Sequence, residues 1–200
     1  MNDRVLDMWS AALAATPGSK LLVLAPHGSH RRRLEKFVLA RGADPSRIEY
    51  LGYEKREEYL KYFHRIDIVL DMWPYNGETT SLDGLWMGVP MVTLCGQTAP
   101  SRAGLCYHTH LGLTDLVAHT PDEYAQIASR LAGDPSRLAE LRSTLRGKLQ
   151  RSPLMDAPTF AKNVEAAYRQ MWLNHQTIAN GVGPTAGTVT PDSVIDTNGK

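Results

Sequence analysis

Short, mostly apolar runs that alternate with helical patterns are the feature of this sequence that most constrains its fold; the first of them, residues 21–24, is continuously apolar. The runs lie at residues 21–24, 48–51, 66–70 and 91–94. Such runs are typical of strands covered on both faces, as in a parallel sheet. Apolar residues recur at helical spacing over residues 2–15, 31–40, 55–63 and 79–87. This alternation predicts βαβ units, so the expected fold class is α/β, a doubly wound and Rossmann-like parallel sheet.

The sheet signal fades after Gly96, and the rest of the chain is helical until its last 25 residues. Helices are expected at residues 102–110, 121–132, 135–150 and 158–175. From Gln176 onward the chain has almost no large apolar residue, and it cannot offset the entropy cost of being ordered. We therefore predict one domain over residues 1–175 and a flexible tail over residues 176–200.

Charge and hydropathy exclude several classes of protein. The 22 Lys and Arg residues balance 21 Asp and Glu residues, which gives a net charge of +1. No basic run offers the surface that nucleic-acid binding needs. No apolar run approaches the roughly 20 residues of a membrane-spanning helix, and the polar start Met1-Asn2-Asp3 is unlike a signal peptide. We expect a cytoplasmic chain that binds neither nucleic acid nor membranes.

Neither the cysteines nor the histidines form a recognisable metal or disulfide pattern. Cys95 and Cys106 are too few for a disulfide framework and lack zinc-site spacing. His108 and His110 point to different faces of a helix, and no Cys, Asp or Glu accompanies them at ligand spacing. No metal site is expected.

The loop that leaves the third apolar run is the first candidate ligand site. Ligands of open parallel sheets bind beyond the carboxyl ends of the strands. Here Gly77 precedes two threonines, Thr79 and Thr80, that open a helix whose free N–H groups could hold a phosphate or diphosphate. Asp83 lies one turn further and could accept hydrogen bonds from ribose hydroxyls. The alternative, in which Thr79 is an N-cap and Asp83 an exposed acid, stays open on spacing alone.

Two other loops follow strands in the same way. In residues 52–59, a nucleobase could rest on Tyr59, with Lys55 or Arg56 as a cation. The alternative is a solvated helix start, which spacing favours. After the fourth run, Arg102 is either a second cation near a diphosphate or a surface arginine. The sequence has no nucleophile elbow, P-loop or dinucleotide-binding turn, so a sugar nucleotide remains the expected ligand.

The order of these motifs resembles the C-terminal catalytic half of the protein O-GlcNAc transferases and their SPINDLY-like relatives, glycosyltransferase family 41. The matching residues are Leu6 and Met8-Trp9, then Leu70-Asp71, Pro74-Tyr75-Asn76-Gly77, Thr79-Thr80, Asp83, Leu85-Trp86-Met87-Gly88-Val89-Pro90, Ser101-Arg102 and Tyr168-Arg169-Gln170-Met171-Trp172. The resemblance covers the chain up to Trp172.

The resemblance implies the C-terminal lobe of a two-lobed GT-B enzyme that holds a nucleotide-sugar donor, usually UDP-GlcNAc. An inverting transfer would place the sugar on Ser or Thr of a protein, without a metal or other cofactor. By position, Thr79 and Thr80 would hold the diphosphate and Asp83 the ribose. The residues that would surround the uridine are Glu54, Arg56 and Tyr59.

In this family, an N-terminal lobe, tetratricopeptide repeats that bind acceptor proteins and a lysine that neutralises the leaving group precede the region matched here. We therefore expect a truncated or separately encoded lobe that is weak or inactive alone. Two alternatives remain: a noncatalytic interaction module that keeps the fold, and a transferase that uses another donor such as a GDP-sugar. No residue stands out as a general base.

Overall fold

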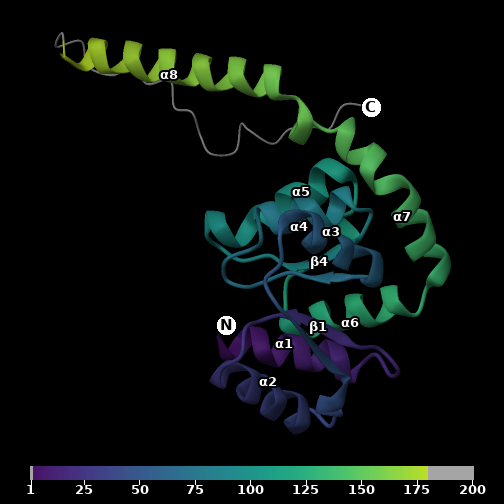
Figure 1. Cartoon of the computed structure of the whole chain (residues 1–200). Helices are drawn as coiled ribbons and strands as arrows, with labels where there is room; N and C mark the ends of the chain where they lie inside the picture. The colour runs from purple at the N-terminus through teal and green to yellow at the C-terminus, as the bar shows by residue number, and fades with distance from the viewer. Residues whose placement is uncertain (1, 180–200) are drawn as a thin grey trace. The chain divides into compact units, whose positions relative to one another are not determined.

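The computed structural model describes residues 2–179 (Figure 1). The chain divides into two compact units, Met1–Met155 and Asp156–Lys200, and each is described by itself. The described residues include no helix that is both long enough and apolar enough to cross a membrane.

The first unit alternates strands and helices. Its strands are β1 (Leu21–Leu24), β2 (Ile48–Leu51), β3 (Val69–Leu70), β4 (Met91–Leu94) and β5 (Val117–Ala118). Its α-helices are α1 (Asp3–Ala14), α2 (Ser29–Ala40), α3 (Arg56–Lys61), α4 (Thr79–Trp86), α5 (Ala103–Leu111), α6 (Pro121–Ala132) and α7 (Pro135–Gln150). Short 3-10 helices are η1 (Pro45–Arg47), η2 (Tyr62–Arg65), η3 (Ala99–Arg102), η4 (Thr114–Leu116) and η5 (Pro153–Met155).

All described strand pairs are parallel, which confirms the α/β prediction. The strands form two sheets, however, where one continuous sheet was expected: β1 pairs with β2, and β4 lies between β3 and β5. β3 is shorter than the predicted strand over residues 66–70, because η2 extends to Arg65 and only Val69 and Leu70 pair with β4. β5 was not predicted, because it is only two residues long.

Side-chain caps and prolines set the helix starts. Asn2 accepts a hydrogen bond from the Val5 N–H at the start of α1, and Asp134 accepts one from the Arg137 N–H at the start of α7. Pro121 and Pro135 occupy the first turns of α6 and α7, where a missing N–H costs nothing.

Helices cover the strands and close one core. α1 packs against α2 and α6, α6 also contacts β4 and β5, and α4 and α5 contact β4 (Figure 1). All four residues of β4 are buried. The fully buried side chains include Leu6, Met8, Leu34, Leu85, Leu113, Tyr124, Leu141 and Leu145.

The second unit contains the helix α8 (Ala157–Ala179). A helix was predicted over residues 158–175, so residues 176–179, assigned to the tail, are helical. The rest of the predicted tail, residues 180–200, lies outside the described residues.

Candidate functional site

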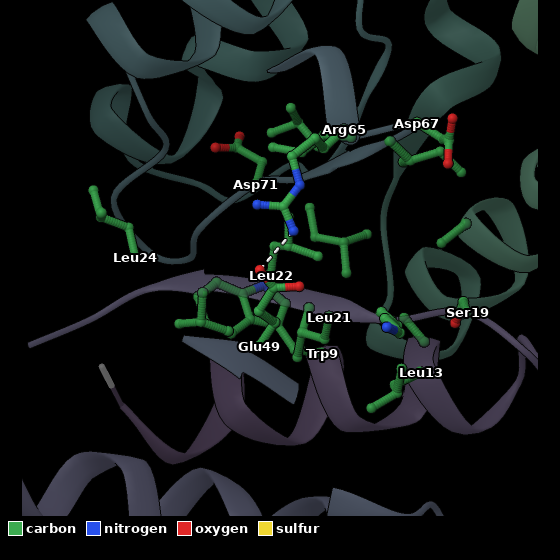
Figure 2. A pocket seen from close by; sticks show the side chains of 18 of the residues that line it. Trp9, Leu13, Ser19, Leu21, Leu22, Leu24, Glu49, Arg65, Asp67 and Asp71 are labelled. Carbon is green, nitrogen blue, oxygen red and sulfur yellow. Dashed lines mark hydrogen bonds and ion pairs between the residues drawn. The ribbon is translucent and has the colours of Figure 1, made fainter. Parts of the chain in front are cut away.

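A cavity of about 770 Å³ lies between the two sheets of the first unit. β1 lines it along its whole length, and both residues of β3 line it from the other side (Figure 2). Across this cavity the strands run in the order 2-1-3-4-5, which places the cavity at the point where the strand order reverses. Ligands of doubly wound folds bind at this switch point.

Two of the residues predicted for the diphosphate, Gly77 and Thr80, line this cavity. Thr79 is exposed beside them but is not part of the cavity lining. Glu78, not Thr79, occupies the N-cap of α4, and its side chain makes no capping hydrogen bond. The N–H groups of the first helical turn therefore lack a side-chain cap, which is the arrangement that binds anions at helix N-termini.

Gly77 brings the loop after β3 against the first turn of α4. A Cβ atom at this position would lie 2.3 Å from Ser81 Oγ and 2.8 Å from Thr80 Oγ1. Glycine was predicted here to let a ligand approach the backbone. In the structure a side chain here would also force the Ser81 and Thr80 hydroxyls to move away from their present positions.

A buried carboxylate, Asp71, organises the loop, and the sequence analysis gave it no role. Its Oδ1 accepts hydrogen bonds from the N–H groups of Met72 and Gly77, both at 2.9 Å, and from the Ser81 hydroxyl at 3.4 Å. Its Oδ2 accepts from the Thr93 hydroxyl at 2.7 Å. An aspartate placed directly after a buried strand and before a Pro/Gly turn is the signal that could have found it.

Asn76 ties the same loop to α5. Its side-chain amide donates to the Met72 carbonyl at 2.8 Å, and its Oδ1 accepts from the Gly104 N–H at 3.2 Å. The Asn76 N–H donates to the Pro100 carbonyl at 3.0 Å. The loop is thus held on three sides by hydrogen bonds.

Burial controls the electrostatics of Asp71. Desolvation raises the pKa of this carboxyl above its ordinary value, although the hydrogen bonds from Gly77, Thr93 and Met72 act in the opposite direction. Tyr124, which is fully buried, donates its hydroxyl to the Asp71 main-chain carbonyl at 2.9 Å. Its pKa is raised well above the ordinary value, first of all by desolvation.

Asp83 and Arg56, predicted for the ribose and the uridine, lie together. The Arg56 guanidinium donates to the two carboxylate oxygens of Asp83 at 2.6 and 3.0 Å. The Asp83 side chain is 11% exposed and that of Arg56 is 62% exposed, so Asp83 is not the exposed acid of the alternative interpretation. The hydrogen bond from Arg56 to Asp83 and the attraction between their charges raise the pKa of Arg56.

The remaining predicted residues are spread along the edge. Tyr59 is half-buried, lines the cavity and contacts Phe63 edge-on, with ring centroids 5.4 Å apart. Burial raises the pKa of its hydroxyl. Glu54 and Arg102 are exposed and do not line the cavity.

Figure 2 shows how the two sheets are linked across the cavity. Arg65, on the β3 side, reaches Glu49 of β2 and forms an ion pair of 2.6 Å. Both side chains are partly exposed, at 50% and 37%.

His108 and His110, which were considered as metal ligands from the sequence, differ in burial. His108 is buried, and its two ring nitrogens each lie 2.7 Å from a main-chain carbonyl, of Gly104 and of Met91. His110 is exposed. Within residues 2–179, no group of three or more His, Cys, Asp or Glu side chains is arranged to hold a metal ion. The expectation that no metal is needed stays a prediction.

Known proteins match this chain over most of its length. The sequence model of Glycosyl transferase family 41 matches residues 1–164. A probable UDP-N-acetylglucosamine–peptide N-acetylglucosaminyltransferase SPINDLY from Oryza sativa subsp. japonica is 36% identical over 173 residues, which are 84% of this chain and 19% of that protein. The UDP-N-acetylglucosamine–peptide N-acetylglucosaminyltransferase of Caenorhabditis elegans is 34% identical over 171 residues, 86% of this chain and 15% of that protein.

A solved structure is similar as well. A mutant O-GlcNAc transferase from Thermobaculum terrenum superposes with a TM-score of 0.78 and 38% sequence identity, covering 86% of this chain and 34% of that one. This likeness agrees with the GT-B expectation for the fold. The chain spans about a fifth of the length of the plant relatives that it matches.

Proposed function

Because this chain belongs to glycosyl transferase family 41, we propose that its first unit is the donor-binding lobe of a protein O-GlcNAc-transferase-like enzyme. The donor is a nucleoside diphosphate sugar, UDP-GlcNAc, and the reaction is an inverting transfer of the sugar to Ser or Thr of a protein. The observation that carries this proposal is the uncapped first turn of α4, with Gly77 and Thr80 on the wall of a cavity at the switch point.

The diphosphate would lie against the start of α4. The N–H groups of the first turn and the hydroxyls of Thr79 and Thr80 are donors suited to phosphate oxygens, and the helix dipole adds to their attraction. Donors fixed before the reaction also stabilise the charge that develops on the leaving UDP. No residue of this lobe is assigned as the general base.

The nucleoside would lie toward α3. Tyr59 can stack on a uracil ring, and Asp83 can accept hydrogen bonds from ribose hydroxyls. Arg56 already holds Asp83 through two hydrogen bonds, so it orients the carboxylate for the ribose. Glu54 would contribute its backbone, and Arg102 would be a second cation near the diphosphate.

Transfer needs more than donor binding. A GT-B site forms between two lobes, and orientation of both substrates supplies many orders of magnitude of rate. We propose that the 200-residue chain by itself binds donor but transfers sugar weakly or not at all. A further lobe and tetratricopeptide repeats, as the family resemblance implies, would supply the acceptor protein. Incubation with UDP-GlcNAc and a Ser/Thr-rich protein tests this, since stoichiometric glycosylation would contradict it.

Calorimetry with UDP, GDP and uridine tests donor binding. We expect UDP to bind more tightly than uridine, because the diphosphate adds contacts to α4. The double variant Thr79→Ala/Thr80→Ala should lose about tenfold or more in UDP affinity, the size expected for lost hydrogen bonds to a charged group. The control is Thr109→Ala/Thr114→Ala, two exposed threonines outside the site, which should bind UDP like wild type. Tighter binding of GDP than of UDP would point to a GDP-sugar donor, and equal heats for all variants would remove α4 from the proposal.

A further inference from the structure

Asp71 and Asp83 are both buried carboxylates at the ligand edge, but their partners differ. Asp83 pairs with an arginine, whereas none of the ion pairs of the described residues includes Asp71. Asp71 is 3% exposed. A buried and unpaired carboxylate is costly unless hydrogen bonds compensate it, and here the hydrogen bonds come from Met72, Gly77, Ser81 and Thr93.

A single oxygen atom of Asp71 closes the loop between β3 and α4. Oδ1 accepts hydrogen bonds from the N–H groups of Met72, at the start of the loop, and of Gly77, near its end, both at 2.9 Å. The Ser81 hydroxyl of α4 approaches the same atom at 3.4 Å. The other oxygen is anchored to Thr93 in the middle of buried β4. The carboxylate thus fixes the loop, the helix start and the sheet relative to one another.

We propose that Asp71 is a positioning residue for the diphosphate site, an inference that rests on the proposed function. Asp71 is among the residues that line the cavity, but it is 3% exposed and both of its oxygens accept hydrogen bonds from the protein, so we assign it a positioning role and not a ligand contact. It acts through Gly77, whose N–H it holds. With Gly77 so fixed, the loop stays folded against α4 and the first-turn N–H groups remain uncapped.

This role predicts that loss of the Asp71 carboxylate changes the affinity for UDP and the affinity for uridine by different amounts. UDP reaches the start of α4, but uridine has no phosphate and depends on α3 and Asp83 instead. Loss of the Asp71 carboxylate therefore weakens UDP binding and leaves uridine binding nearly unchanged. A purely structural defect would lower the affinity for both ligands together.

The test compares wild type with Asp71→Ala, Asp71→Asn and Tyr124→Phe in the full chain, with UDP and uridine titrated separately. Asp71→Ala removes the acceptor and should weaken UDP binding about tenfold or more. Asp71→Asn keeps an oxygen for Gly77, and its amide can donate to the Thr93 hydroxyl, so UDP affinity should return to within about threefold of wild type. Tyr124→Phe removes a buried hydrogen bond to the Asp71 main chain but leaves the carboxylate in place, so UDP affinity should stay at the wild-type value.

Hydrogen exchange of the Gly77 amide separates this inference from the proposed function. The amide should be protected in wild type and in Asp71→Asn, and it should exchange faster in Asp71→Ala. If the wild-type chain does not bind UDP, the proposed function is wrong, and Asp71 then has no role in ligand binding. The exchange rates of the Gly77 amide still show in that case whether Asp71 restrains the loop. If wild type binds UDP and Asp71→Ala binds it equally well, or loses uridine binding in the same proportion, the positioning role is wrong.

Discussion

The middle strand of the three-stranded sheet, β4, and the strand β2 of the two-stranded sheet differ in how deeply they are buried. Every residue of β4 in the three-stranded sheet is buried, whereas every residue of β2 in the two-stranded sheet is only half-buried. The loop of Gly77, Thr79 and Thr80 follows half-buried β3 but is anchored to buried β4 through the hydrogen bond between Asp71 and Thr93. Of the nucleoside residues, Glu54, Arg56 and Tyr59 follow β2, whereas Asp83 belongs to α4. We infer that the diphosphate meets a rigid surface, while the nucleoside meets a surface that can adjust.

Different interactions also hold the two sheets to their surroundings. Around β4 the polar contacts are buried, as between Thr93 and Asp71. Beside β2, Arg47 of η1 donates to the carbonyls of Leu13, Thr16 and Ser19, and surface ion pairs such as Arg41 with Asp7 join α2 to α1. Buried contacts of this kind resist opening better than exposed ones.

The largest expected effect is the difference in unfolding free energy between two Leu→Ala substitutions, one in each sheet. Leu94→Ala in β4 removes a side chain that is 1% exposed and should cost about 2–5 kcal/mol in the free energy of unfolding. Leu22→Ala in β1 removes a half-buried side chain that already faces the cavity, so its cost should be about 1 kcal/mol. Urea unfolding of both variants measures the difference, and equal costs would show that the two sheets are equally well packed.

Tyr59 carries the aromatic ring that was predicted to stack on the nucleobase, so its removal tests the nucleoside part of the site. Tyr59→Ala should weaken UDP and uridine equally, by about threefold to tenfold, because it removes only stacking. The matched control is Tyr53→Ala in the loop just before α3, since Tyr53 is 76% exposed and should leave both affinities unchanged. A loss of UDP affinity alone would place Tyr59 at the diphosphate instead of the base.

The buried charge in the rigid sheet predicts a pH effect on stability. Because the pKa of Asp71 is raised by burial above the ordinary value of 3.8, the folded protein binds this proton more tightly than the unfolded chain does. The wild-type free energy of unfolding therefore falls as pH rises from about 3.8 through the raised pKa. Asp71→Asn lacks this charge, so its stability relative to wild type should increase between pH 4 and pH 7. Thermal unfolding across that range measures the effect, and a difference independent of pH would contradict it.

The smallest expected effect on stability is that of the ion pair across the cavity, between Arg65 and Glu49. A double-mutant cycle of Arg65→Ala and Glu49→Ala should give a coupling below about 1 kcal/mol, as for other exposed pairs, and the coupling should shrink as salt is added. A larger and salt-insensitive coupling would mean that this pair locks the two sheets together.

Strong local patterns made much of the fold predictable. β1, β2 and β4 begin and end at the predicted residues, because each is a short, mostly apolar run. β5 is only Val117–Ala118, too short to give a pattern. The gap between the sheets depends on the strand pairing of β3, which no local signal encodes.

The residues of the candidate site at the start of a helix could be predicted from the sequence. The pairs of residues that are far apart in the sequence could not. Thr80 and Gly77 lie on the cavity wall because they open α4 at the ligand edge. The hydrogen bond from Thr93 to Asp71 joins residues 22 positions apart, and the pairing of Arg56 with Asp83 joins residues 27 positions apart. Spacing along the sequence does not show such pairs.

Amide chemical shifts during a UDP titration test most directly whether the first turn of α4 binds the diphosphate. We expect the Gly77, Thr79 and Thr80 amide signals of the wild-type chain to move with UDP and to stay in place with uridine, while signals near Tyr59 move with both. Saturable UDP shifts confined to other parts of the chain, with these three amides unmoved, would contradict the proposed diphosphate site.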